Sequence, residues 1–133
     1  MIRLKDIALQ QGSFELEDIQ LELAAGEYGV LMGQSGCGKT TVLEAICGLR
    51  EVAGGTIELG GRDVTALPPA ERGVGYVPQD RALFPTQIVR EQLAFALVLR
   101  DQPQNVIASR VGELAELLGI TSLLDRAPEN LSG

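Results

Sequence analysis

The feature that most constrains the fold is the octapeptide GQSGCGKT at residues 33–40. It follows a short apolar run, YGVLM at residues 28–32, and precedes a segment whose apolar residues recur at helical spacing. The octapeptide fits the pattern G-x-x-x-x-G-K-[ST], in which glycines let the backbone curl until successive N–H groups point inward at an anion. The sequence therefore predicts a buried strand over 28–32, a phosphate-binding loop and an amphipathic helix, in that order. The fixed positions of the pattern are Gly33, Gly38, Lys39 and Thr40.

The residue types in this loop suit a nucleoside triphosphate bound with Mg²⁺. Lys39 supplies a mobile positive charge for the terminal phosphates, and the Thr40 hydroxyl can ligate the metal that bridges them. The N-terminus of the following helix adds its positive end to the same anion. The predicted nucleotide-binding residues are Gly33, Gln34, Ser35, Gly36, Cys37, Gly38, Lys39, Thr40 and Thr41.

The remainder of the chain changes from strands to helices. Residues 2–9 and 14–23 alternate apolar and polar side chains, with a slip at Glu17-Asp18, and predict two half-buried strands. Residues 54–64 predict a strand, a Gly-Gly turn and the start of another strand, and Gly48 is placed to end the helix after the loop. Residues 73–78 form another short predicted strand. The later predicted elements are helices at 88–100 and 104–118, with a helical turn at 121–126. We expect an α/β domain with a strand-rich part at 1–78 and a helical part at 79–133.

Charge and composition argue against several classes. The formal net charge is −7, and the chain has no basic stretch, which disfavours a nucleic-acid surface because such surfaces use clustered Lys and Arg. Cys37 and Cys47 do not have metal-ligand spacing, and no histidine is present to complete a zinc site. The longest apolar run, residues 93–99, is far shorter than the roughly 20 residues that a membrane-spanning helix needs.

Two long stretches then resemble one family. GQSGCGKTTVLEAICGL and GGTIELGGRDVTALPPAERGVGYVPQDRALFP are similar to the ATP-binding subunit of an ABC transporter, closest to importers of oxyanions, polyamines, iron or sugars. The resemblance covers essentially the whole chain, with several motifs in the family's order. It implies a P-loop NTPase fold of the ABC type: an antiparallel β subdomain, an incomplete RecA-like core with a parallel sheet, and an α-helical subdomain.

The resemblance assigns catalytic and signature roles outside the loop. Gln79 matches the Q-loop glutamine, which contacts Mg²⁺ and the attacking water, so Lys39 and Gln79 become the expected catalytic residues and Thr40 and Gln79 the metal ligands. A solvated loop glutamine is the alternative for Gln79. The tripeptide Leu131-Ser132-Gly133 matches the start of the signature motif, which faces the γ-phosphate held by a second copy; the alternative is a chance tripeptide in a loop.

One family feature departs from its usual position. An aromatic residue that stacks on adenine is expected near Gln11, which is not aromatic. Phe14 is the nearest substitute, because a flat aromatic face suits a base. On sequence period alone, Phe14 is equally a core residue of the second strand.

The resemblance also implies a chain cut within the signature motif. The family's Mg²⁺-binding aspartate, water-polarising glutamate and switch histidine lie beyond that motif, so we expect these 133 residues alone not to hydrolyse ATP. A central strand of the parallel sheet would be missing as well. Val30, Met32 and Val77 are then expected to lack neighbours, and the stability to be low.

The function that the resemblance implies is ATP binding and hydrolysis that drive solute transport through a partner permease, with ATP and Mg²⁺ as ligands. A head-to-tail homodimer, an indirect link to a solute-binding protein and a place at the cytoplasmic face of the cell membrane follow from the same likeness. Leu83 and Phe84 are the expected permease-docking residues, and Ile88, Phe95 and Leu97 the packing residues. The alternatives are a non-catalytic nucleotide-binding fragment and a soluble ABC-type ATPase without a transport role. A small-molecule kinase would leave Gln79 and residues 131–133 unexplained.

Overall fold

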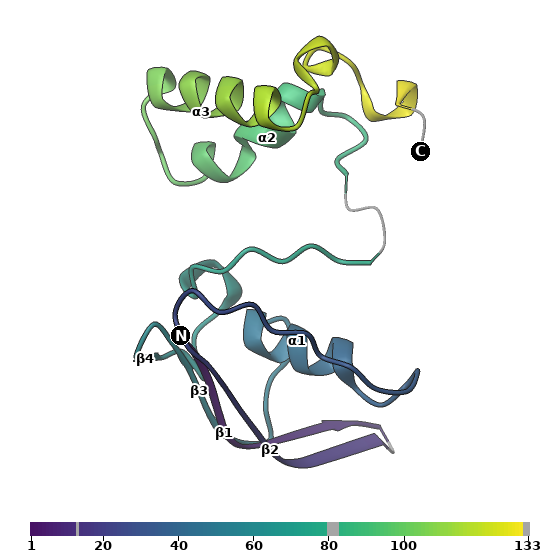
Figure 1. Cartoon of the computed structure of the whole chain (residues 1–133), viewed down its shortest axis with the longest axis vertical. Coiled ribbons are helices and arrows are strands. Elements are labelled where there is room, and N and C mark those ends of the chain that lie inside the picture. Colours follow the sequence, from purple (N-terminus) through teal and green to yellow (C-terminus); the bar gives the residue numbers. More distant parts are fainter. Residues whose placement is uncertain (13, 80–82, 132–133) are drawn as a thin grey trace. The chain divides into compact units, whose positions relative to one another are not determined.

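The computed structural model describes residues 1–12, 14–79 and 83–131. The chain divides into two compact units, Met1–Tyr76 and Val77–Gly133, and each is described by itself (Figure 1). The described residues of the first unit form a sheet, an α-helix and a 3₁₀ turn, and those of the second form two α-helices and two 3₁₀ turns.

The sheet of the first unit is antiparallel throughout. Its strands are β1 (Ile2–Gln11), β2 (Phe14–Leu23), β3 (Gly54–Leu59) and β4 (Arg62–Asp63). Their order is β2-β1-β3-β4, so β1 pairs with both β2 and β3. The period-two segments at 2–9 and 14–23 and the strand-turn-strand at 54–64 therefore form as predicted, because one apolar face of each strand meets the core.

Two irregularities in the β1–β2 ladder correspond to unusual backbone angles. The register shifts once between Leu4 and Ile7 and again between Ile7 and Leu9. Asp6 and Asp18 have φ values of 51° and 55°, a left-handed conformation that aspartate tolerates better than most residues. The Gln20 amide donates to both carboxylates, at 3.2 and 3.3 Å. The slip predicted at Glu17-Asp18 is thus a β-bulge, which returns the following apolar residues to the core face.

The α-helix α1 (Lys39–Cys47) packs on one face of this sheet. Gly48 ends it with φ 79°, and the N–H groups of Gly48 and Leu49 donate to the carbonyls of Ala45 and Glu44, at 3.1 and 2.9 Å. This is the glycine C-cap that the sequence predicts. The buried residues of the core are Leu4, Ile7, Leu9, Val42, Ala45, Ile46, Ile57 and Val64.

Two predicted strands do not form, because their backbones make no strand pairing with the described residues. Residues 28–32 and 73–78 are not paired with any strand in the described part of the chain. The expectation that residues 28–32 are buried also fails, because Tyr28 is 90% exposed and Met32 84%. A strand needs a neighbour for its N–H and C=O groups, so an apolar sequence alone does not make one. The expected lack of neighbours at Val30, Met32 and Val77 is confirmed, with exposed fractions of 65%, 84% and 92%.

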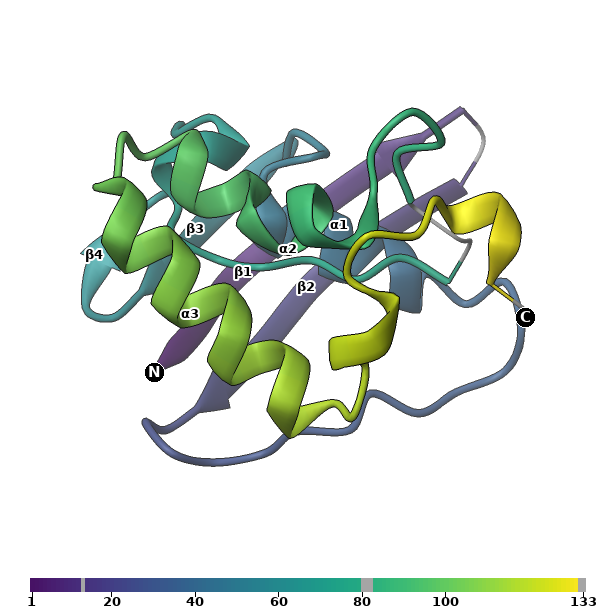
Figure 2. The same cartoon turned by 90° about the horizontal axis from the view of Figure 1, so that it is seen from above.

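The second unit is a helical hairpin with a small core. α2 (Val89–Val98) packs against α3 (Gln104–Leu117), side by side in both views (Figures 1 and 2). The chain turns between them at Asp101, with φ 50°, and Pro103. The 3₁₀ turns are η1 (Pro69–Glu71) in the first unit, and η2 (Thr121–Leu123) and η3 (Pro128–Asn130) in the second. Both predicted helices are present, and neither they nor any other described helix has the length and apolarity to cross a membrane. The core residues are Ala94, Ile107, Val111, Ala115 and Leu124.

Candidate functional site

The phosphate loop, defined here as residues 33–38, leads directly into α1. Residues 33–37 are exposed, and a turn closes within them where the Cys37 N–H donates to the Gln34 carbonyl at 3.3 Å. The first hydrogen bond of the helix is donated by Val42 to Gly38 at 3.0 Å. The amides of residues 39–41 are therefore not used by the helix, since the first N–H groups of any helix lack an acceptor within it. They are donors at the positive end of α1, as an anion site requires.

The side chain of Lys39, the first residue of α1, points back into this loop. Its ammonium donates to the carbonyls of Gly33 and Gln34, at 2.9 and 2.6 Å, and lies 3.6 Å from the Cys37 Sγ. A Cβ at Gly33 would lie 2.8 Å from the same sulfur, so a larger residue at position 33 requires the Cys37 side chain to move. The structure thus brings Gly33, Gln34, Cys37 and Lys39 together around one ammonium group, which places the positive charge at the centre of the loop.

β2 contacts the loop where the helix begins. Gly38 has φ 94°, and a Cβ there would overlap Leu16 Cδ1 and lie 3.0 Å from Phe14 Cζ. Phe14 is half-buried against Gly38, and its backbone pairs with Gln11 of β1. Phe14 therefore lies at the phosphate loop, on the strand next to the position where the resemblance expects an aromatic residue. The contact with Gly38 is a packing contact, and stacking on adenine stays a prediction.

The predicted metal ligands are a hydroxyl and an amide. Thr40 is exposed in the first turn of α1 and Thr41 is half-buried beside it. The described residues contain no group of three or more His, Cys, Asp or Glu side chains that could hold a metal alone. This donor set fits Mg²⁺, which keeps several waters and is held by one or two protein oxygens together with substrate phosphates.

The other predicted site residues lie in the second unit. Gln79 is exposed, directly after the extended segment 73–78. Leu131 follows η3, and its N–H donates to the Pro128 carbonyl at 3.0 Å. The remaining signature residues, Ser132 and Gly133, lie outside the described residues.

Arg72 is a buried residue that the sequence reasoning missed. Its side chain donates to the carbonyls of Ala45, Ile46, Leu67 and Thr65, at 2.7, 3.1, 2.8 and 2.9 Å. Burial lowers the pKa of Arg72 and raises the pKa of the neighbouring Cys47 thiol. No sequence pattern indicates this, because arginine is usually exposed.

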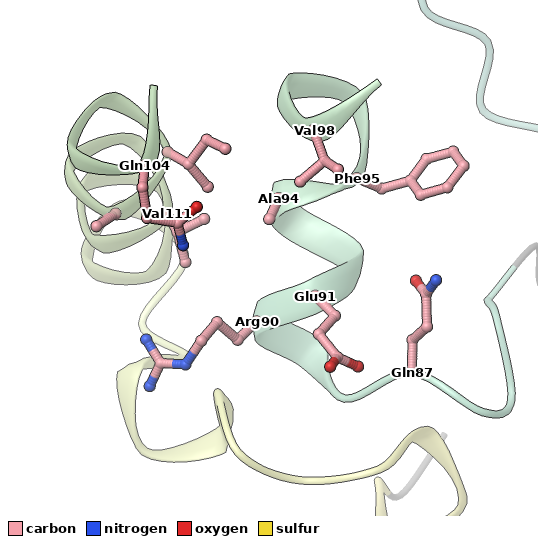
Figure 3. A pocket seen from close by; sticks show the side chains of 10 residues that line it. Gln87, Arg90, Glu91, Ala94, Phe95, Val98, Gln104 and Val111 are labelled. Atoms are coloured by element: carbon pink, nitrogen blue, oxygen red, sulfur yellow. The ribbon is translucent and has the colours of Figure 1, made fainter. Parts of the chain in front are cut away.

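Two apolar hollows occur in the second unit. Leu83, 53% exposed, lines a hollow of about 220 Å³ together with apolar side chains that include Val89, Leu93 and Leu131. Phe84, 43% exposed, packs its ring at 4.7 Å from that of Phe95. A second hollow of about 590 Å³ lies between α2 and α3, with Ala94, Phe95 and Val111 among its lining residues (Figure 3). Leu83 and Phe84 are thus exposed, and Ile88, Phe95 and Leu97 are partly buried.

A glycine-rich loop that opens a helix packed on a sheet defines the class of phosphate-loop nucleotide-binding domains. The sequence pattern of the ABC transporter family matches residues 16–133, and the chain belongs to that family. Two solved structures share the fold. A crystal structure of an ATP-binding cassette of an ABC transporter has a TM-score of 0.83 and 23% identity, and the match covers 100% of this chain and 59% of that one. A dimeric ATP-binding cassette bound to ADP and Pi has a TM-score of 0.84 and 22% identity, and the match covers 99% of this chain and 63% of that one.

Curated relatives carry names of import systems. The chain is 42% identical to a molybdate/tungstate import ATP-binding protein of Thermococcus kodakarensis, over 100% of this chain and 40% of that protein. It is 47% identical to an Fe(3+) ions import ATP-binding protein of Rhizobium meliloti, over 89% of this chain and 30% of that protein. It is 44% identical to a maltose/maltodextrin import ATP-binding protein of Yersinia pestis, over 87% of this chain and 31% of that protein. The chain therefore spans about two fifths or less of the length of these relatives.

Proposed function

We propose that this chain forms the nucleotide-binding part of an ATPase subunit that energises solute import through a partner permease. The observation that carries the proposal is the phosphate loop, where Lys39 lies among the loop carbonyls at the free N-terminal amides of α1. Three of the relatives are named as import ATP-binding proteins, and these names support the choice of import over other uses of this family. The acidic net charge of −7 supports a role without nucleic acid.

The loop residues would hold the phosphates of ATP. The amides of the phosphate loop and of the first turn of α1 donate to the β- and γ-phosphate oxygens, and Lys39 exchanges the carbonyls of Gly33 and Gln34 for those oxygens. Mg²⁺, when bound with the nucleotide, neutralises phosphate charge and would be held by the Thr40 hydroxyl and the Gln79 amide oxygen. In hydrolysis a bond forms between the water oxygen and the γ-phosphorus, the bond to the β,γ-bridging oxygen breaks, and ADP and phosphate are released. Gln79 would orient the attacking water.

Two interactions complete the proposal. In a head-to-tail homodimer, Leu131, Ser132 and Gly133 would face the γ-phosphate held by the second copy. A dimeric ATP-binding cassette with the same fold supports the dimer in this proposal. The exposed Leu83 and Phe84 offer apolar area for a permease at the cytoplasmic face of the cell membrane, and a solute-binding protein would act indirectly through that permease.

Removal of the loop ammonium tests the proposal. Lys39→Ala should weaken binding of a fluorescent ATP analogue about 10- to 100-fold, because a hydrogen bond to a charged group contributes about 1.5–3 kcal/mol. Lys5→Ala is the matched control, since Lys5 is paired with Glu58 on the sheet surface. An unchanged dissociation constant in Lys39→Ala would contradict the proposed site. Phosphate release from the same samples separates hydrolysis from binding alone.

A further inference from the structure

Arg72 is the charged side chain that the described part of the chain buries most, with 8% exposed. All its hydrogen bonds go to main-chain carbonyls, through three different nitrogens. An arginine offers five N–H donors in a planar fork, whereas a lysine offers three on one nitrogen. The hydrogen bonds of Arg72 therefore require donors on several nitrogens, which lysine does not have.

The four carbonyls belong to two separate segments. Those of Ala45 and Ile46 lie in the last turn of α1, where carbonyls have no acceptor role in the regular i to i+4 ladder of the helix and the helix dipole is negative. The Ala45 carbonyl also accepts from the Gly48 N–H of the C-cap. Those of Thr65 and Leu67 lie between β4 and η1. Arg72 thus joins the C-terminal end of α1 to the segment after the sheet. Gly48 allows this approach, because a Cβ there would lie 2.5 Å from Arg72 Nε.

The opposite end of the same helix carries the phosphate loop. There, Phe14 and Leu16 of β2 pack against Gly38. α1 has nine residues and is therefore about 14 Å long, and its middle rests on the sheet through buried side chains such as Val42. Because the helix is short and its middle is held on the sheet, a displacement of one end displaces the other end by a similar distance. Misplacement of about 1 Å in a site can cost about 100-fold in function.

We propose that Arg72 is a positioning residue for the phosphate loop. It fixes the C-terminal end of α1 and thereby keeps the amides and Lys39 at the N-terminal end directed at the phosphates. This inference rests on the proposed function, because it requires that the loop binds ATP.

The test compares Arg72→Met, Arg72→Lys and the core variant Val64→Ala in the full chain. Val64 is buried in the core of the first unit, so Val64→Ala lowers stability while the guanidinium and its four acceptor carbonyls all remain present. The dissociation constant of a fluorescent ATP analogue is measured at a temperature where every variant is folded, with melting temperatures recorded in parallel. We expect Arg72→Met to weaken binding about tenfold, Arg72→Lys to recover part of the loss, and Val64→Ala to bind as the wild type does.

The outcomes separate the two proposals. Wild-type affinity in both folded Arg72 variants would overturn the positioning role, and so would an equal loss of affinity in Val64→Ala. If Arg72→Met does not fold, Gly48→Ala replaces it, because its Cβ displaces the same guanidinium. Wild-type affinity in Gly48→Ala would then overturn the positioning role, and a loss absent from Val64→Ala would support it. A wild-type chain that binds no ATP would refute the proposed function itself, and the positioning role with it.

Discussion

Gly55 offers a sharp test of the packing between β1 and β3. It has φ 87°, and it lies opposite the register shift that separates Lys5 and Ala8 on β1. A Cβ at this position would overlap the Asp6 carbonyl oxygen and lie 2.5 Å from the Lys5 carbonyl oxygen. Both atoms are backbone, so they can move only if the two strands separate. Gly55→Ala should therefore weaken the centre of the sheet.

The expected loss has two parts. A left-handed conformation costs a non-glycine residue about 1–2 kcal/mol, from which the reduced freedom of the unfolded chain recovers about 0.4–1 kcal/mol. Forcing extra atoms into a packed site costs a further 1–3 kcal/mol or so. Gly61→Ala is the matched control, because Gly61 has φ 86° but nothing within 4 Å of its Cβ position. We expect losses of about 2–4 kcal/mol for Gly55→Ala and about 1 kcal/mol for Gly61→Ala.

Urea unfolding and hydrogen exchange measure the difference. Exchange of the β1–β3 amides reports on the first unit by itself, since protection reflects the stability of the local cooperative unit. In thermal unfolding, the two losses correspond to decreases of about 15 °C and about 5 °C in Tm for a unit of this size. Equal losses in the two variants would show that the close approach of β1 and β3 costs nothing, and would refute the reasoning.

Two further predictions concern the loop and acid stability. Gly38→Ala should reduce ATP affinity and melting temperature more than Gly36→Ala does. Both glycines have positive φ, but only the Cβ at position 38 would meet Leu16 and Phe14. Isothermal titration and thermal melting measure the two effects, and equal effects in the two variants would contradict the prediction. Hydrogen bonds from the Thr65 hydroxyl and N–H, at 2.6 and 2.9 Å, lower the pKa of Asp63 from its ordinary 3.8. Its contribution to stability is therefore present above that value and lost as the pH falls through the lower folded-state pKa. The difference in Tm between wild type and Asp63→Asn should thus shrink between pH 6 and about pH 2, and a constant difference would exclude this role.

Much of the local structure could be predicted from the sequence. The alternation in residues 2–9 and 14–23 predicts β1 and β2, and the slip at Glu17-Asp18 marks a bulge of their ladder. The helical period after the phosphate loop and the position of Gly48 predict α1 and its end. Each of these features is encoded within about ten neighbouring residues, where side-chain period and glycine chemistry act directly.

The remainder could not be predicted in this way. Residues 28–32 have the sequence of a buried strand, yet Tyr28 and Met32 are exposed, because burial depends on a partner and not on apolarity. The sheet itself places β1 between β2 and β3, which are separated by thirty residues of chain that include the loop and α1.

The sequence by itself predicted the phosphate loop, the residue types proposed to hold ATP, and the helix that follows the loop, but not the exposed, unpaired segment before it. Only the tertiary structure decided that Arg72 is buried against the carboxyl end of α1, that Phe14 and Leu16 pack beneath Gly38, and that Gly55 has no room for a side chain. The physical reason is the separation in sequence of the residues that interact. Period and turn chemistry act between close neighbours in the chain, whereas the burial of a charge or the close approach of two backbones depends on atoms contributed by residues far apart in sequence.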